Sequence, residues 1–230
     1  MSLFAGVRSA VGSVGDRAVD LALPATCAGC YVRGTSLCRE CRVALQARLA
    51  TGSAVPLGLA ADPPGPLAQL EWCAPFTGLT RRVVERLRDA GERRLSRPLG
   101  EAIASRWAIA GSGGDVLVPV PSPADETRSR GYDHTLLLAE VAARRLRVPA
   151  AQALARTSAN DFAVIAPTLV EGRSVVLVHD VVTSTPALAA CAGVLIAAGA
   201  HLVSAVAVAR AYETASVPAM LVPAGGLAAS

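Results

Sequence analysis

Three short runs rich in valine, separated by segments with helical spacing, constrain the fold of this chain most. The runs are VLVPV (116–120), SVVLVHD (174–180) and LVSAVAVA (202–209). Residues 134–147 and 187–198 have the spacing of apolar residues that is typical of helices. Alternating strands and helices predict an α/β fold, in which a parallel sheet is covered by helices on both faces.

A long uncharged stretch allows a second interpretation of the same region. No Asp, Glu, Lys or Arg occurs from Val181 to Ala209, which is long enough for a transmembrane helix. Pro186 near its start and Gly199 inside it favour a helix, a turn and a strand of an α/β sheet instead. Charged residues also interrupt the apolar N-terminal stretch, at Arg8, Asp16 and Arg17. We therefore expect neither a signal peptide nor a membrane span, and a cytoplasmic protein.

The composition excludes several classes of protein. Hydrophobic residues make up 52% of the 230 residues and charged residues 17%, which is too apolar for a disordered polar chain. Aromatic residues make up only 3%, so a nucleic-acid module built on stacking rings is not expected. All basic side chains are arginines, which excludes a lysine Schiff base and the lysine of a P-loop.

The chain divides into four segments. Residues 1–50 hold an expected N-terminal helix and a group of cysteines, and residues 51–66 form a linker rich in Pro, Gly and Ala. Residues 67–212 form the α/β domain, and residues 213–230 form a tail. The expected N-terminal helix has apolar residues at helical spacing: Leu3, Phe4, Val7, Val11, Val14, Ala18 and Leu21.

Four cysteines form the motif C-x2-C-x7-C-x2-C, at Cys27, Cys30, Cys38 and Cys41. Each C-x2-C turn directs two thiolates at one point, and two such turns complete a tetrahedral zinc site. Four protein ligands leave no open position on the metal, so the zinc is expected to be structural. An iron–sulfur cluster uses the same type of ligand, whereas a pair of disulfides is disfavoured in the cytoplasm.

A candidate phosphate site follows the second predicted strand. Asp180 lies at the end of this strand, and Thr183, Ser184 and Thr185 precede a helix that begins near Pro186. Ligands of open parallel sheets bind at the carboxyl ends of strands, and free amides at a helix N-terminus bind phosphate. The alternative is that Ser184 or Thr185 is an ordinary helix N-cap.

The end of the first predicted strand offers arginines for an anion. After VLVPV, the sequence PSPADETRSRGYDH places Ser122, Arg128 and Arg130 in a predicted loop. Gly131 and His134 lead into the next helix. Two guanidinium groups facing a shared cleft suit a polyanion such as pyrophosphate, and the alternative is a solvated arginine loop.

A segment rich in arginine lies between the cysteines and the first predicted strand. Residues 79–110 have a helical pattern that we expect to break at Gly91 and Pro98. Between Thr80 and Gly100 there are seven arginines and three acidic residues, which gives a local charge of +4. A solvated helix face with internal ion pairs is one interpretation, and contact with phosphate or single-stranded DNA is the other.

In their order along the chain, these elements resemble the ComF family of phosphoribosyltransferase-like proteins, which is linked to competence. The resemblance covers the N-terminal cysteine motif, the segment WCAPFTGLTRRVVERLRDAGERRLSRPLGEAI, the PVPS and RSRGYDH loop, and VVLVHDVVTSTPA. It implies a type I phosphoribosyltransferase-like fold with a small N-terminal zinc finger. It also implies a ligand, phosphoribosyl pyrophosphate, whose pyrophosphate is held with Mg²⁺.

The resemblance assigns roles to residues at the two strand ends. The acidic position contacts the ribose hydroxyls, which here implies Asp180 and, in place of a first acid, His179. Residues 183–185 would wrap the 5-phosphate. The loop after the first strand would hold the pyrophosphate, which implies Ser122, Arg128, Arg130, Gly131 and His134.

The sequence departs from the family pattern, in which two acids and two variable residues precede Thr-Thr-Gly-Ala-Thr. His179 replaces the first acid, Thr185 the glycine, Pro186 the alanine and Ala187 the last threonine. These changes remove a flexible backbone position, an amide donor and a hydroxyl. Two functions follow: a phosphoribosyltransferase, or a non-enzymatic docking protein that handles DNA with the DNA-uptake machinery.

Overall fold

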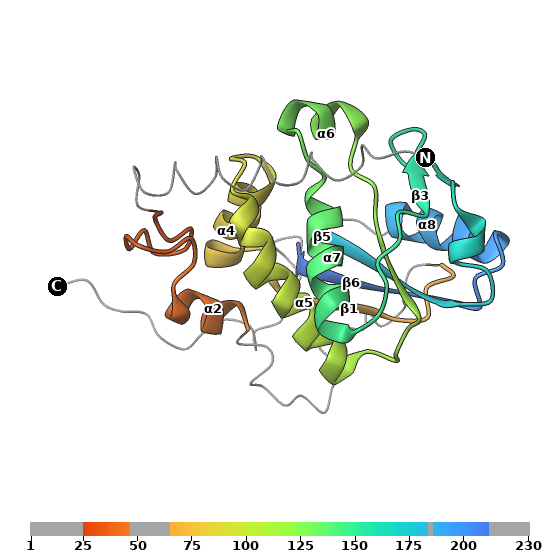
Figure 1. Ribbon diagram of the computed structural model, residues 1–230, viewed down its shortest axis with the longest axis horizontal. Helices are drawn as coiled ribbons and strands as arrows, with labels where there is room; N and C mark the ends of the chain where they lie inside the picture. The colour runs from red at the N-terminus through yellow and green to blue at the C-terminus, as the bar shows by residue number, and fades with distance from the viewer. Residues whose placement is uncertain (1–24, 47–64, 184–185, 212–230) are drawn as a thin grey trace, which may run out of the picture.

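A computed structural model describes residues 25–46, 65–183 and 186–211 of the chain (Figure 1). The helix predicted over residues 3–22 and the tail at 213–230 lie outside the described residues, as do Ser184 and Thr185. No helix in the described ranges has the length and apolarity needed to cross a membrane.

The core of the fold is a parallel sheet of four strands in the order β1-β6-β5-β2. The strands are β1 (Leu70–Pro75), β2 (Val116–Pro119), β5 (Ser174–Val182) and β6 (Leu202–Arg210). In register, Val116 pairs with Val175, and Ser174 with Leu202. The three valine-rich runs are therefore parallel neighbours, as the sequence predicts, and the uncharged stretch is a strand end, a helix and a strand.

Helices cover both faces of the sheet, because successive side chains of each strand point to opposite sides. Val176 and Val178 of β5 pack with one group of helices, whereas Val175 and Leu177 pack with another. The first face carries α4 (Gly78–Arg88), α5 (Ser96–Ala110) and α7 (His134–Leu146). The second carries α8 (Pro186–Ala197) and the antiparallel hairpin of β3 (Leu154–Arg156) and β4 (Phe162–Val164). This confirms an α/β fold with helices on both faces.

Three local features differ from the prediction. Residues 124–130 form a helix, α6 (Ala124–Arg130), and not the expected loop. Pro98 does not break a helix; it lies in the first turn of α5, where a missing N–H removes no helical hydrogen bond. Strand β1 was not predicted at all. Two short 3₁₀ turns complete the described elements, at Arg93–Leu95 and Pro167–Leu169.

The cysteine motif packs against α4. It contains one short helix, α2 (Arg39–Leu45), and its buried residues Cys27 and Leu37 belong to the same apolar cluster as Val83 and Leu87 of α4. Arg82 of α4 donates a hydrogen bond to the Gly29 carbonyl oxygen at 2.8 Å. A Cβ atom at Gly29 would lie 2.2 Å from Leu79 Cδ1, so only glycine permits this close approach. We call residues 25–46 the finger below.

Candidate functional site

The topology of the sheet places a switch point between β2 and β5, and we use the word crevice for the region at the carboxyl ends of these two strands. After β2 the chain passes through α7 and returns at Ala150, which pairs in parallel with Leu117 on the outer side of β2. After β5 it passes through α8, on the opposite face, to β6 on the other side. Adjacent strands whose connections leave in opposite directions form a topological switch point, where α/β proteins bind ligands at the carboxyl ends.

Asp180, at the carboxyl end of β5, is buried in this crevice and surrounded by donors. Its side chain is 6% exposed, and its Oδ2 atom lies 3.0 Å from His134 Nε2. Its Oδ1 atom accepts a hydrogen bond from the Val181 backbone N–H at 2.7 Å and lies 2.9 Å from His179 Nδ1. The Arg88 guanidinium, at the end of α4, lies 4.0 Å from Oδ2. Both oxygens of this carboxylate are therefore engaged within the protein.

These neighbours keep the carboxylate ionised. Burial alone raises the pKa of a carboxyl group, because it disfavours the charged form. Here the charge of His179 and the hydrogen bond from His134 outweigh burial and hold the pKa of Asp180 well below its usual range. An ionised carboxylate buried at this depth is stable only while those donors remain in place.

His134 connects Asp180 to helix α6. Arg130 Nη1 lies 3.3 Å from His134 Nδ1, and a guanidinium can only donate, so Nδ1 accepts and Nε2–H donates to Asp180. Arg130 also forms an ion pair with Glu126, one turn earlier on α6. A continuous polar chain thus runs from the exposed surface of α6 to the buried end of β5.

The start of α7 is fixed by Asp133, which caps the helix. Its Oδ1 atom accepts hydrogen bonds from the backbone N–H groups of Thr135 and Leu136, and from the Ser122 hydroxyl at 3.2 Å. Gly131 adopts a left-handed conformation, with φ of 73°, where α6 ends and the chain turns toward α7. This cap places His134 in the first turn of α7, facing β5.

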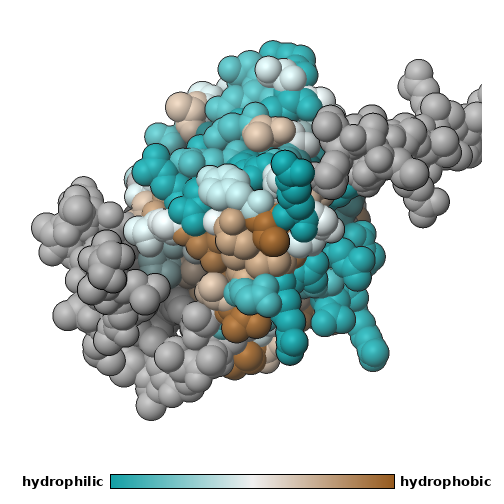
Figure 2. Space-filling view, turned by 90° about the vertical axis from the view of Figure 1, so that its left-hand side faces the viewer, coloured by the Kyte–Doolittle hydropathy of each residue, from teal (hydrophilic) through white to brown (hydrophobic). Residues whose placement is uncertain are grey.

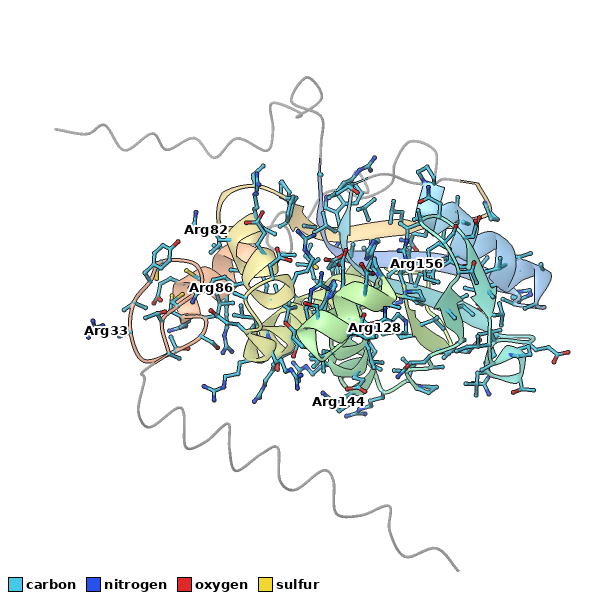
Figure 3. The ribbon with its side chains drawn as sticks, turned by 90° about the horizontal axis from the view of Figure 1, so that it is seen from above. Arg33, Arg82, Arg86, Arg128, Arg144 and Arg156 are labelled. Atoms are coloured by element: carbon cyan, nitrogen blue, oxygen red, sulfur yellow. The ribbon has the colours of Figure 1, made fainter. Side chains whose placement is uncertain are left out.

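The predicted site residues fall into three groups. Asp180, His179, His134 and Arg130 come together in the crevice, and Ser122 reaches the same loop through Asp133. Arg128 lies on α6 (Figure 3), where it is exposed and has no hydrogen bond or ion pair with any described residue. Thr183 is exposed at the end of β5, and Ser184 and Thr185 lie outside the described residues.

Sequence analysis missed two members of the polar chain, Arg88 and Glu126. Arg88 was one of seven arginines in a segment with no local sign that this one faces β5. Glu126 lies four residues before Arg130, a spacing that would have suggested an ion pair if residues 124–130 had been predicted as a helix.

Other arginines of the segment between Thr80 and Gly100 have partners within the protein. Arg81 pairs with Glu85, Arg86 with Glu92, and Arg97 with Glu101. Arg93 donates to the Gly131 carbonyl oxygen and lies over the Tyr132 ring, 4.5 Å from its centroid. These contacts favour the interpretation that the arginines form a helix face with internal ion pairs, and not a surface that binds DNA.

The four cysteines of the finger form the second site. Their sulfur atoms all lie within 4.8 Å of one another, and they are the one such cluster of potential metal ligands among the described residues. Cys30 Sγ and Cys38 Sγ are 3.6 Å apart, far from the roughly 2.05 Å of a disulfide bond. Four sulfurs at about 2.3 Å from a central zinc would be about 3.8 Å apart. The cluster therefore has a geometry compatible with a structural zinc site.

The thiols of this cluster also have the electrostatics of a cation site. Burial disfavours the Cys27 thiolate, but backbone N–H groups, those of Cys38 and Gly29 among them, lower the pKa of Cys27 to about 6. Burial and the neighbouring thiols raise the pKa of Cys41. One thiolate thus opposes the ionisation of its neighbours. A divalent cation at the centre would remove that repulsion.

Comparison with known proteins adds no assignment. No model of a protein family matches the chain, and no curated protein matches it significantly. The resemblance to ComF proteins therefore depends on the motifs described above, and the function must be argued from the two sites.

Proposed function

We propose that this chain is a ComF-like protein with a phosphoribosyltransferase-type fold that binds a phosphate-bearing ligand but transfers no ribose. One observation carries the proposal: the single acid at the end of β5, Asp180, is buried and engaged through both oxygens. In the family pattern, a pair of acids at this place contacts the ribose hydroxyls. Here His179 stands at the first acidic position, and the remaining acid, Asp180, accepts hydrogen bonds from His134 and the Val181 N–H.

The chemistry of ribose binding explains why this matters. A carboxylate recognises two adjacent hydroxyls by accepting hydrogen bonds, so its lone pairs must be free and accessible. Releasing Asp180 for this purpose would leave the His134 Nε2–H without its acceptor and Arg88 without its buried counter-charge. Leaving buried donors unpaired costs about 1–3 kcal/mol for each group. A transfer reaction that depends on Asp180 is therefore disfavoured.

Phosphate binding is less affected than ribose binding, because it requires donors and positive charge. Thr183 is exposed at the start of the loop, and α8 directs its N-terminus toward the same end of the sheet. Two donors of the family pattern are missing, since Pro186 has no N–H and Ala187 has no hydroxyl. Arg128 lies on α6, which follows the carboxyl end of β2; it is exposed, has no hydrogen bond or ion pair with any described residue, and offers a bidentate contact for a second phosphate. We expect weak binding with no release of pyrophosphate.

We also propose that the finger holds one structural zinc ion through Cys27, Cys30, Cys38 and Cys41. When bound, the metal supplies a cross-link between the two cysteine turns and α2, and no catalysis, because no coordination position is left open. A role in DNA uptake comes from the ComF resemblance. The internal ion pairs of the segment from Arg81 to Arg97 do not favour a contact with single-stranded DNA.

Restoring the family residues in the β5–α8 loop is expected to strengthen binding of phosphoribosyl pyrophosphate at least tenfold. The variant combines His179→Asp, Thr185→Gly, Pro186→Ala and Ala187→Thr. It restores an acid, a flexible backbone position, an amide and a hydroxyl, and each hydrogen bond to a charged ligand contributes about 1.5–3 kcal/mol. Calorimetric titration of both proteins with phosphoribosyl pyrophosphate and Mg²⁺ measures the change.

A matched control tests whether the loop is responsible. Arg173→Ala changes a half-buried arginine just before β5, at the opposite end of the strand from the loop, and should leave binding unchanged. Tight binding by the wild type would contradict the proposed function. A folded quadruple variant that still fails to bind would show that the crevice no longer accepts this ligand.

A further inference from the structure

The finger exposes an apolar surface that the fold does not cover. Tyr31, Val32 and Val43 are 63%, 50% and 62% exposed, and they are three of the seven large hydrophobic residues exposed among the described residues. Figure 2 shows apolar atoms gathered on the end of the molecule that carries α2 and the cysteine turns. We call these three residues the finger patch. Three large exposed hydrophobic residues on a segment of only 22 described residues favour a surface that contacts something else.

The sequence before the finger contains an apolar stripe. Within residues 1–24, the residues Leu3, Phe4, Val7, Val11, Val14, Ala18 and Leu21 recur at intervals of three and four. At about 100° per residue they share one side of a helix. Ser9, Ser13, Asp16 and Asp20 fall on the opposite side.

The point where this segment joins the finger lies beside the patch. The Ala25 carbonyl oxygen accepts a hydrogen bond from the Gly34 N–H at 2.7 Å, and Thr26 pairs with Arg33. The first described residues therefore run alongside the strand-like segment that contains Val32. A proline disfavours helix at the residue before it, so Pro24 sets a boundary for the stripe, and only residues 22–24 separate Leu21 from the first described residue.

We infer that residues 3–21 fold back as an amphipathic helix whose apolar stripe covers the finger patch of the same chain. A tether this short gives the segment an effective concentration near the millimolar range, far above that of a second molecule. Gly6, Gly12 and Gly15 weaken an isolated helix, so the segment needs a packing surface in order to become helical.

A membrane surface fits the same stripe less well. Helices that lie on anionic membranes carry an excess of Lys or Arg outside the apolar side, whereas here Arg8 and Arg17 are balanced by Asp16 and Asp20. Packing of the apolar stripe on the finger patch would bury both apolar surfaces within a single chain. The inference is independent of the ligand proposed for the crevice.

Hydrogen–deuterium exchange of the full chain tests this inference. Peptides from residues 3–21 should be protected in the wild type, and Val43→Asp should speed their exchange at least tenfold while zinc content stays unchanged. Val43 is exposed on α2, so the substitution leaves the cysteine cluster intact. Ile109→Asp, at a similarly exposed residue of α5, is the matched control and should leave the exchange as in the wild type.

Four outcomes would overturn the inference. One is rapid exchange of residues 3–21 in the purified wild-type protein, and another is protection that Val43→Asp does not reduce. Protection that increases with protein concentration would assign the patch to a second copy. Protection that develops only with vesicles of phosphatidylcholine and phosphatidylglycerol would assign the stripe to a membrane.

Discussion

Replacing Cys27 or Cys41 by serine is expected to release the zinc ion and unfold the finger. Wild-type protein should carry about one zinc per chain, and each variant close to none. Structural zinc contributes about 10–16 kcal/mol of apparent binding free energy in small zinc domains, so a lost ligand exceeds what the finger's few apolar contacts can offset. Elemental analysis measures the metal, and protease sensitivity of residues 25–46 measures the unfolding.

The effect should extend beyond the finger, because its buried residues share a core with α4. Leu79 of α4 contacts Gly29, and Arg82 is bonded to the Gly29 carbonyl oxygen. The matched control is Cys191→Ala, since Cys191 is a buried cysteine of α8 whose pKa is raised to about 12 by burial. This variant should keep the metal. A wild-type protein that contains no zinc, when prepared without a tag and under anaerobic conditions, would refute the assignment.

The parts of the fold that could be predicted from the sequence are those whose pattern is local. The runs at 116–120, 174–180 and 202–209 are buried on both sides of a parallel sheet, so they are continuously apolar and easy to identify. The cysteine cluster is equally local, because its spacing alone brings four sulfurs to one point. In both cases the residues that define the feature are close neighbours in the sequence.

Strand β1 escaped prediction because its second residue, Glu71, depends on a distant partner. Glu71 is fully buried, and its carboxylate receives hydrogen bonds from Arg106 Nε and Nη2 at 2.9 and 2.6 Å. A glutamate in a short run argues against a buried strand, unless the arginine 35 residues later is known to pair with it. The pairing is created by the fold and cannot be seen in LEWCAP.

The same limit applies to the candidate site. The sequence predicts that Asp180 lies at the carboxyl end of a strand, where ligands of parallel sheets bind. The structure confirms this position. Whether its oxygens are free depends on His134, which lies 46 residues away, and on Arg88, which lies on another helix. A motif identifies the residue at a position, but tertiary contacts decide whether the side chain of that residue is free to bind a ligand.

Asp180→Asn is expected to destabilise the protein by about 3–5 kcal/mol, the usual result of removing one partner from a buried charged network. Asparagine keeps the shape but has only one oxygen. If that oxygen faces His134, the amide N–H₂ meets the Val181 N–H, and in the reverse orientation it meets the His134 Nε2–H. Either orientation places two donors against each other. Chemical denaturation of both proteins at neutral pH measures the difference.

The pH dependence of the free energy of unfolding provides an independent test of the structural role of Asp180. The folded-state pKa of Asp180 is well below its usual value, so its stabilisation is complete above the unfolded-state pKa of about 3.9. It is lost as the pH falls through the lower folded-state pKa. Asp180→Asn lacks this contribution at every pH, so the stability gap between wild type and variant should narrow on acidification below about pH 4.

The control and the binding measurement separate a structural role from a ribose contact. Asp89→Asn removes an exposed partner of the same Arg88 and should cost less than about 1 kcal/mol. If Asp180 is a structural anchor, Asp180→Asn lowers stability, while the fraction that remains folded binds phosphoribosyl pyrophosphate as weakly as the wild type. If Asp180 binds ribose, the variant keeps its stability and loses the ligand, because ligand-binding residues are seldom optimised for stability. That second outcome would restore the transferase hypothesis.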